Sequence, residues 1–165
     1  APLHMHHAKT VKLILQQRSD HSMNLGQFAV LFGTNRDAED FHAYCMMAQG
    51  ISATLHTTNK TIDLEEDSIH LITAHSAKGL EFPHVSIPLA AKLAGNYKSC
   101  LAENNRFDLK EFEDSNNKLL YVACSRAAES LTIIQETEAP PSALDHLMPG
   151  DWEVEEYPHE EFRIQ

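Results

Sequence analysis

Short, almost continuously apolar runs recur along the chain and are separated by polar or periodic segments. Runs of this length, bounded by turn residues, are typical of strands buried in a parallel sheet. We predict strands at 28–32, 51–56, 69–73, 85–89 and 131–134.

Helical periodicity fills the intervals between these runs. Residues 8–18 carry an apolar stripe, and a second helical pattern begins at a cap residue, Thr34 or Asn35, and stops at Gly50. A turn of helix is expected near 76–80 and a longer helix within 109–128. Strands that alternate with helices predict an α/β fold, in which helices cover both faces of a parallel sheet.

Aromatic residues within the helical patterns lie at core spacing. Phe41, Tyr44 and Tyr121 are therefore predicted to pack inside the protein rather than to stack on a ligand.

Length and composition favour one globular domain followed by an acidic extension. The 165 residues are 42% hydrophobic and 22% charged, which suits a single core. The character changes at residue 136, where a proline-containing connector and an acidic run begin. We therefore divide the chain into a domain at 1–135 and an extension at 136–165.

The net charge of −11 is unfavourable for binding nucleic acid, but its distribution is uneven. The extension holds nine acidic residues against one base, Arg163, so residues 1–135 carry a charge of only −3. A local basic groove is compatible with that value.

The sequence has no apolar window of the roughly 18 residues that a membrane span requires, and we expect no membrane association. Cys45, Cys100 and Cys124 are far apart and form no C-x-x-C pair. This spacing suits reduced thiols in a cytoplasmic protein and predicts no metal site.

Residues 73–82, T-A-H-S-A-K-G-L-E-F, place polar chemistry at the end of a predicted strand. Small residues there allow a ligand to approach the exposed backbone N–H groups. The stretch is a candidate site for a phosphate or a sugar.

Three segments together resemble one family. F-A-V-L-F-G-T-N at 28–35, L-I-T-A-H-S-A-K-G-L-E-F at 71–82 and K-L-L-Y-V-A-C-S-R-A at 118–127 resemble, in order, motifs IV, V and VI of the UvrD/Rep-type superfamily 1 DNA helicases. The resemblance covers residues 28–135.

The resemblance implies a RecA-like second motor domain, called 2A in that family. ATP and Mg²⁺ then bind in a cleft against the N-terminal motor domain of the same parent protein, which holds most of the Mg²⁺ contacts. The chain begins at Ala1 and contains no G-x-x-x-x-G-K-[ST] phosphate loop, so we expect a C-terminal fragment that does not hydrolyse ATP alone.

The resemblance also assigns residue roles. Arg126 matches the catalytic arginine that reaches the γ-phosphate, and Gly79 and Glu81 fall where the family contacts the nucleotide. Thr73, His75 and Lys78 match positions that touch the backbone of single-stranded DNA. A surface ion pair for Arg126, a turn glycine and helix-capping glutamate, and a solvated lysine are the alternatives.

Two departures from the family pattern affect the interpretation. Gly33 stands where the family usually has an arginine that contacts the γ-phosphate, and Arg36 is the nearest base. Residues 51–68 leave only 18 positions where well-studied members insert a large 2B subdomain, a layout closer to the HelD-like branch, whose members associate with RNA polymerase.

Three functions therefore remain open. The chain is the C-terminal motor domain of an ATP-dependent DNA helicase or translocase, an interaction module that serves RNA polymerase or has lost its ATPase, or a generic flavodoxin-like binding domain. Since the three motifs lie at strand ends or helix starts, we expect Gly33, residues 73–81 and Arg126 on neighbouring edges of one exposed face.

Overall fold

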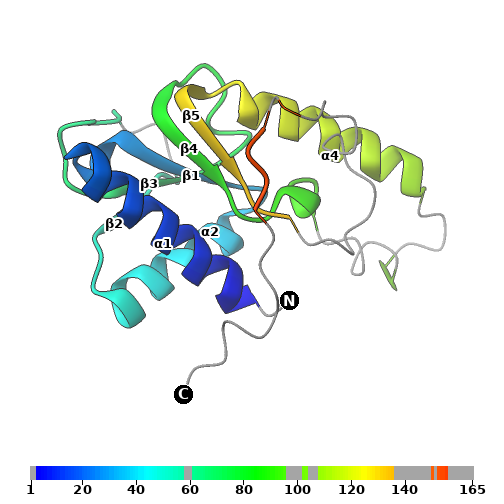
Figure 1. The fold of residues 1–165 in the computed structure, drawn as a ribbon. Helices are drawn as coiled ribbons and strands as arrows, with labels where there is room; N and C mark the ends of the chain where they lie inside the picture. Colours follow the sequence, from blue (N-terminus) through cyan, green and yellow to red (C-terminus); the bar gives the residue numbers. More distant parts are fainter. Residues whose placement is uncertain are drawn as a thin grey trace.

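Five parallel strands form a single sheet in the order β2-β3-β1-β4-β5 (Figure 1). This computed structural model describes residues 3–57, 61–95, 102–103, 108–135, 150 and 152–155. The strands are β1 (Phe28–Phe32), β2 (Ala53–Leu55), β3 (Ile69–Thr73), β4 (Phe82–Ile87) and β5 (Ala127–Ile133).

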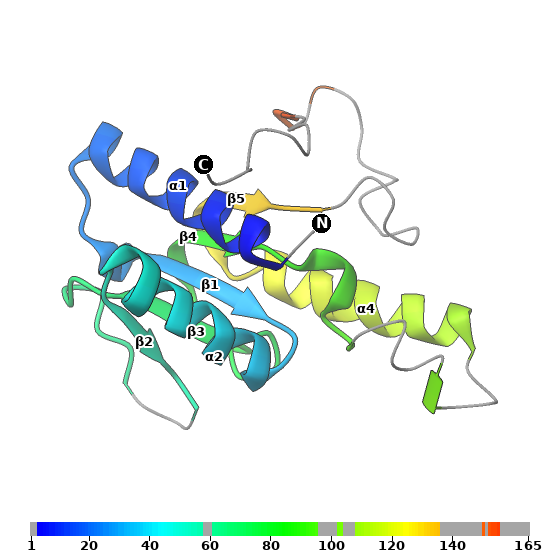
Figure 2. The same ribbon diagram turned by 90° about the horizontal axis from the view of Figure 1, so that it is seen from below.

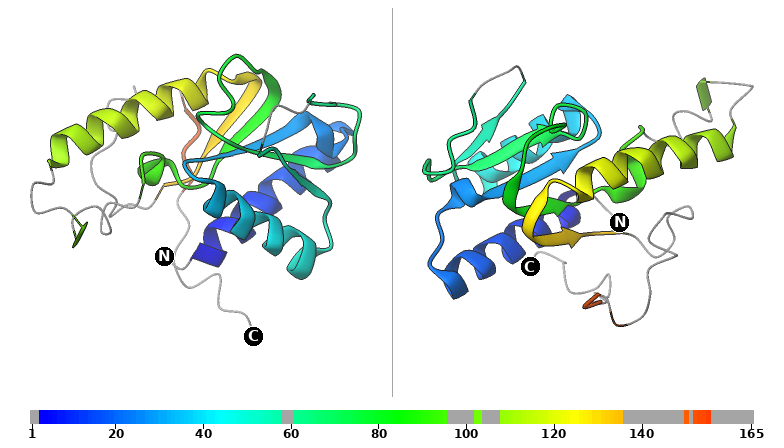
Figure 3. Two further views of the ribbon diagram at one scale, coloured as in Figure 1. Left: turned by 180° about the vertical axis from the view of Figure 1, so that it is seen from behind. Right: turned by 90° about the horizontal axis from the view of Figure 1, so that it is seen from above.

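Helices cover both faces of the sheet, which confirms the predicted α/β class. The helices are α1 (Leu3–His21), α2 (Asn35–Ala43) and α4 (Leu109–Cys124), with the short helices η1 (Leu25–Gln27), η2 (Tyr44–Gln49) and η3 (Ala90–Lys92). Figure 2 shows α1 and α2 in front of the strands, whereas the right-hand view of Figure 3, from the opposite side, shows α4 in front.

Successive side chains of β1 point to opposite faces of the sheet and contribute to two separate core clusters. Phe28, Val30 and Phe32 pack in a cluster that contains residues of α1 and α2. Ala29 and Leu31 point to the other face and pack in the cluster that contains residues of α4. All five residues are at most 1% exposed, because β1 is central and covered on both faces.

Several element boundaries differ from the predicted ones. β4 and β5 begin three and four residues earlier than their apolar runs, and the segment after Asn35 continues from α2 into the π-helix η2 before Gly50 ends it with φ 60°. β5 is an edge strand whose residues are half-buried or exposed, so its first half, A-A-E-S, carries no apolar signal.

Residues 74–81, here called the crossover, connect β3 to β4 without a helix. The predicted helical turn near 76–80 is instead a series of turns, in which the N–H groups of Ala77 and Leu80 donate to Thr73 O and Ala77 O at 3.0 and 2.9 Å. Ala74 and Ala77 are fully buried in the cluster that holds Ala29. These small side chains let the crossover pass directly over β1, although parallel strands usually need a longer connection.

Buried polar side chains fix two loops to this scaffold. Asn116 of α4 donates to Ala90 O at 2.8 Å and accepts from the N–H of Ala94 at 3.0 Å. His70 of β3 contacts His56 Nε2 through Nδ1 at 2.8 Å, and its Nε2 contacts Asp63 O at 3.1 Å.

Candidate functional site

Thr73 and His75 lie at the carboxyl end of the sheet, beside the end of β1. Phe32 pairs with Thr73 in the strand register, and the N–H of Ala74 donates to Phe32 O at 2.8 Å. The Thr73 hydroxyl is 3.0 Å from Ser76 Oγ and accepts from the Ser76 N–H at 3.3 Å. Because Thr73 is buried and turned into these bonds, the exposed side chain of His75 is the more accessible group at this end.

Arg126 lies at the opposite, amino end of the sheet. It precedes β5, and its carbonyl accepts from the N–H of Phe82, the first residue of β4, at 2.9 Å. Its guanidinium donates to Leu80 O through Nη1 at 3.2 Å. Glu81 lies between the two residues that bond to Arg126, so the structure places the predicted ATP contacts Glu81 and Arg126 near each other, and the Glu81 side chain is exposed.

Gly79 and Lys78 occupy the exposed outer side of the crossover. Gly79 has φ 84°, a left-handed conformation that favours glycine, and a Cβ there would meet no atom within 4 Å. The glycine is therefore required by its backbone conformation, and it leaves open space beside Glu81.

The expectation that Gly33, residues 73–81 and Arg126 lie on neighbouring edges of one exposed face is wrong, because Gly33 and Thr73 lie at one end of the sheet and Glu81 and Arg126 at the other. Phe28 pairs with His84, so Phe82 lies about six residues, or roughly 20 Å, from the carboxyl end of β1. The rule that places ligand-binding residues at the carboxyl ends of strands does not locate Glu81 and Arg126, because both residues precede a strand rather than follow one.

Close packing explains why residue 33 is a glycine, which the sequence did not reveal. A Cβ on Gly33 would lie 2.3 Å from Leu93 O and 2.7 Å from Leu93 C, which are both backbone atoms. Arg36 is exposed at the start of α2, at the same carboxyl end. Neither position is therefore adjacent to Arg126.

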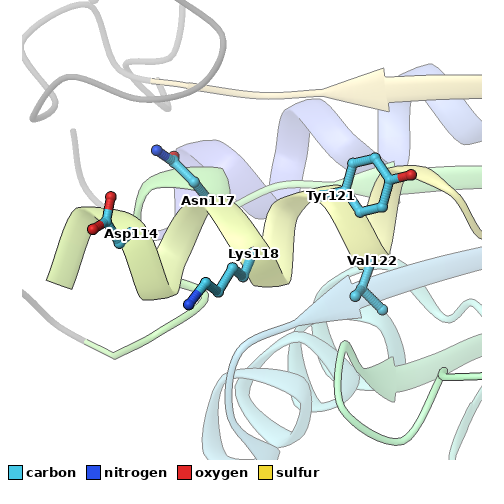
Figure 4. Close-up of a pocket in the computed structure, with 5 residues that line it drawn as sticks. All are labelled: Asp114, Asn117, Lys118, Tyr121 and Val122. Atoms are coloured by element: carbon cyan, nitrogen blue, oxygen red, sulfur yellow. The ribbon is translucent and has the colours of Figure 1, made fainter. Parts of the chain in front are cut away.

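One face of α4 is open to solvent and forms a shallow depression. Asp114, Asn117, Lys118, Tyr121 and Val122 line it (Figure 4), with a volume of about 510 Å³. Tyr121 is 77% exposed, so its predicted place in the core is wrong. The core face of α4 runs through Phe112, Asn116 and Leu120, and Tyr121 is turned about 100° away from Leu120.

Two further findings concern metals and membranes. Across the described ranges, no three His, Cys, Asp or Glu side chains are grouped so that they could hold a metal ion. None of the helices in that part of the chain has the length and apolar character that a membrane crossing needs.

Comparisons with known proteins agree with the fold and identify a family. The family model of the UvrD-like helicase C-terminal domain matches residues 50–138. The structure of the C-terminal domain of a possible DNA helicase from Lactobacillus plantarum WCFS1 is similar, with a TM-score of 0.54 and 22% identity over 84% of this chain and 70% of that chain. At that identity the likeness shows a shared fold. No curated protein matches.

The matched segment runs from the end of η2 through β2, β3, β4, α4 and β5. It includes the whole crossover and Arg126, and it spans more than half of the chain. The chain therefore belongs to the UvrD-like helicase C-terminal domain family.

Proposed function

We propose that the chain is the second motor domain of an ATP-dependent DNA helicase or translocase. It supplies one wall of the ATP site and part of the track for single-stranded DNA. The observation that supports this most is the separation of the two predicted residue sets. Glu81 and Arg126 precede the paired residues Phe82 and Ala127 at the amino end of the sheet. Thr73 and His75 lie at the carboxyl end, about 20 Å away.

At the amino end, Arg126 is the proposed catalytic residue. Its guanidinium is always charged, and its planar fork stabilises the charge that develops on a transferring phosphoryl group. Glu81 is exposed and accepts from ribose hydroxyls or bound water, while Gly79 lets the backbone approach the nucleotide. Mg²⁺, held mainly by the other motor domain, would neutralise phosphate charge.

At the carboxyl end, the proposed DNA contacts are sequence-independent. His75 at this end and Lys78 on the outer side of the crossover are exposed and suit phosphate oxygens, whereas the Thr73 hydroxyl contributes either directly or by holding the turn at Ser76. Contacts of this kind read no base, which is what a translocating motor requires.

The proposed partner for the open face of α4 is the N-terminal motor domain of the same parent protein. The depression around Tyr121 lies on the helix that leads to Arg126. A domain seated on this face would hold its bound nucleotide near the arginine. With one wall of each site, the isolated chain is expected to be inactive and to bind single-stranded DNA weakly, since its net charge is −11.

DNA-stimulated ATP hydrolysis by the full-length parent protein tests the proposal. Arg126→Ala should lower turnover by roughly 10³ to 10⁵ and leave nucleotide binding nearly intact, because an arginine finger acts on transition-state charge. Arg126→Lys should not restore turnover, since a point charge lacks the fork.

The matched control is Arg36→Ala, which removes an exposed arginine at the other end of the sheet and should leave the hydrolysis step unchanged. Near-normal turnover of Arg126→Ala would contradict the motor assignment. It would favour the alternative in which the chain is an interaction module, for example one that associates with RNA polymerase.

A further inference from the structure

The guanidinium of Arg126 is bonded within its own domain by all three of its nitrogens. Nε donates to Val122 O at 3.2 Å, Nη1 to Leu80 O at 3.2 Å and Nη2 to Ser125 Oγ at 3.0 Å. An arginine has five N–H donors, so only two remain for a ligand in this position. A phosphate that takes more than these two N–H donors therefore draws the side chain away from at least one of these acceptors.

The acceptors join two segments that are distant in the sequence. Val122 O belongs to the last turn of α4, where carbonyls lack helical partners and the helix dipole attracts positive charge. Leu80 O belongs to the last turn of the crossover, 46 residues earlier. The side chain thus ties the end of α4 to the end of the crossover.

We propose that Arg126 is a latch as well as a phosphate contact. In the docked position it fixes the crossover through Leu80 O, and its movement to a nucleotide phosphate releases that carbonyl. This inference rests on the proposed function. It makes Arg126 a positioning residue for the proposed DNA contacts, because the far end of the crossover carries His75 and adjoins Thr73.

The crossover is suited to transmit such a release. It spans the sheet in eight residues without a helix, and the turn bonds from Ala77 and Leu80 are among the few backbone bonds that hold it. The Leu80 N–H and Leu80 O belong to consecutive peptide units, so freeing the carbonyl loosens the turn at Ala77. Binding at the two ends is then coupled, and coupling of binding equilibria is reciprocal.

Amide hydrogen exchange on the 165-residue chain tests the latch without nucleotide. In Arg126→Ala, the amides of Ala77 and Leu80 should exchange about tenfold faster, the effect of losing roughly one net charge-assisted hydrogen bond. Arg126→Lys should show a similar acceleration, since one ammonium cannot span three acceptors. The amides of β1 exchange through global unfolding and should share that loss of stability. The comparison is therefore with an amide at the opposite edge of the sheet that opens locally, that of Ile51, which donates to Cys45 O at 2.9 Å and should stay within twofold.

Arg36→Ala serves as the matched control and should leave the crossover amides unchanged, because Arg36 is exposed at the opposite end of the sheet. Unchanged exchange at Ala77 and Leu80 in both Arg126 variants would overturn the latch. Acceleration shared equally by the Ile51 amide would overturn it too, because Arg126 would then support the whole domain rather than the crossover.

The second arm uses the full-length protein with ADP and aluminium fluoride, with and without a single-stranded oligonucleotide. The transition-state mimic should accelerate exchange at Ala77 and Leu80 in the wild type and not in Arg126→Ala, where the latch is already open. If Arg126→Ala loses ATP turnover but the mimic does not change exchange in the wild type, the latch is contradicted and the proposed function is not. Retained turnover in Arg126→Ala would sink the proposed function itself.

Discussion

Replacing Gly33 with alanine tests why this chain lacks a side chain where the family usually has an arginine. The added Cβ would lie 2.3 Å from Leu93 O and 2.7 Å from both the carbonyl carbon and Cα of Leu93. Real Cβ atoms do not approach backbone atoms this closely, so either β1 or the segment after η3 must move. Both lie in the core, where Phe32 is fully buried and Leu93 is 1% exposed.

The expected cost is that of overpacking a well-filled core, about 1–3 kcal/mol. For a chain of this size, that free energy lowers the melting temperature by roughly 2–12 °C. Thermal unfolding and urea titration, both followed by circular dichroism, measure the change. Gly33→Arg should be at least as destabilising, because it adds a long side chain to the same clash.

Gly50→Ala is the matched control. Gly50 has φ 60°, and a Cβ there meets no atom within 4 Å, so this change costs only the backbone strain of about 1–2 kcal/mol. A Gly33→Ala variant as stable as the wild type would refute the packing argument. The absence of a side chain at position 33 would then have no packing reason.

Three further predictions concern stability. Ser22, just after α1, has φ 53°, which is strained for a residue with a Cβ. Ser22→Gly should therefore raise the free energy of unfolding by about 1 kcal/mol in urea titration, and no gain would contradict this strain. Asn116→Asp removes the amide donor of a buried bridge and should destabilise by about 1–3 kcal/mol, whereas Asp114→Asn at an exposed position of α4 should be nearly neutral. Burial lowers the pKa of His7 to about 4 and also lowers the pKa of His70. Because the unfolded chain then binds more protons, stability should fall as pH drops from about 6.5 towards 4, and a flat profile of unfolding free energy there would contradict this.

The hydrophobic pattern alone was sufficient to predict the central strands of the fold. β1 and β3 match the predicted ranges because both strands are buried on both faces, so every residue in them is apolar or enclosed. Both ends of the helical segment at 35–49 were also predictable, because they depend on local interactions. The hydroxyl of Thr34 accepts from the N–H of Asp37, and Gly50 ends the segment in a left-handed conformation. The amino-acid types in the crossover and around Arg126 also indicated the family before any geometry was known.

Only the tertiary structure decided which of these residues meet. Gly33 and Thr73 meet at one end of the sheet, while Glu81 and Arg126 meet at the other, because strand order and direction place residues that no local pattern relates. The early start of β5 was hidden because an edge strand needs no apolar run. Arg126 contacts the backbone carbonyl of Leu80. Every residue has such a carbonyl, so the sequence could not predict which one the arginine would contact.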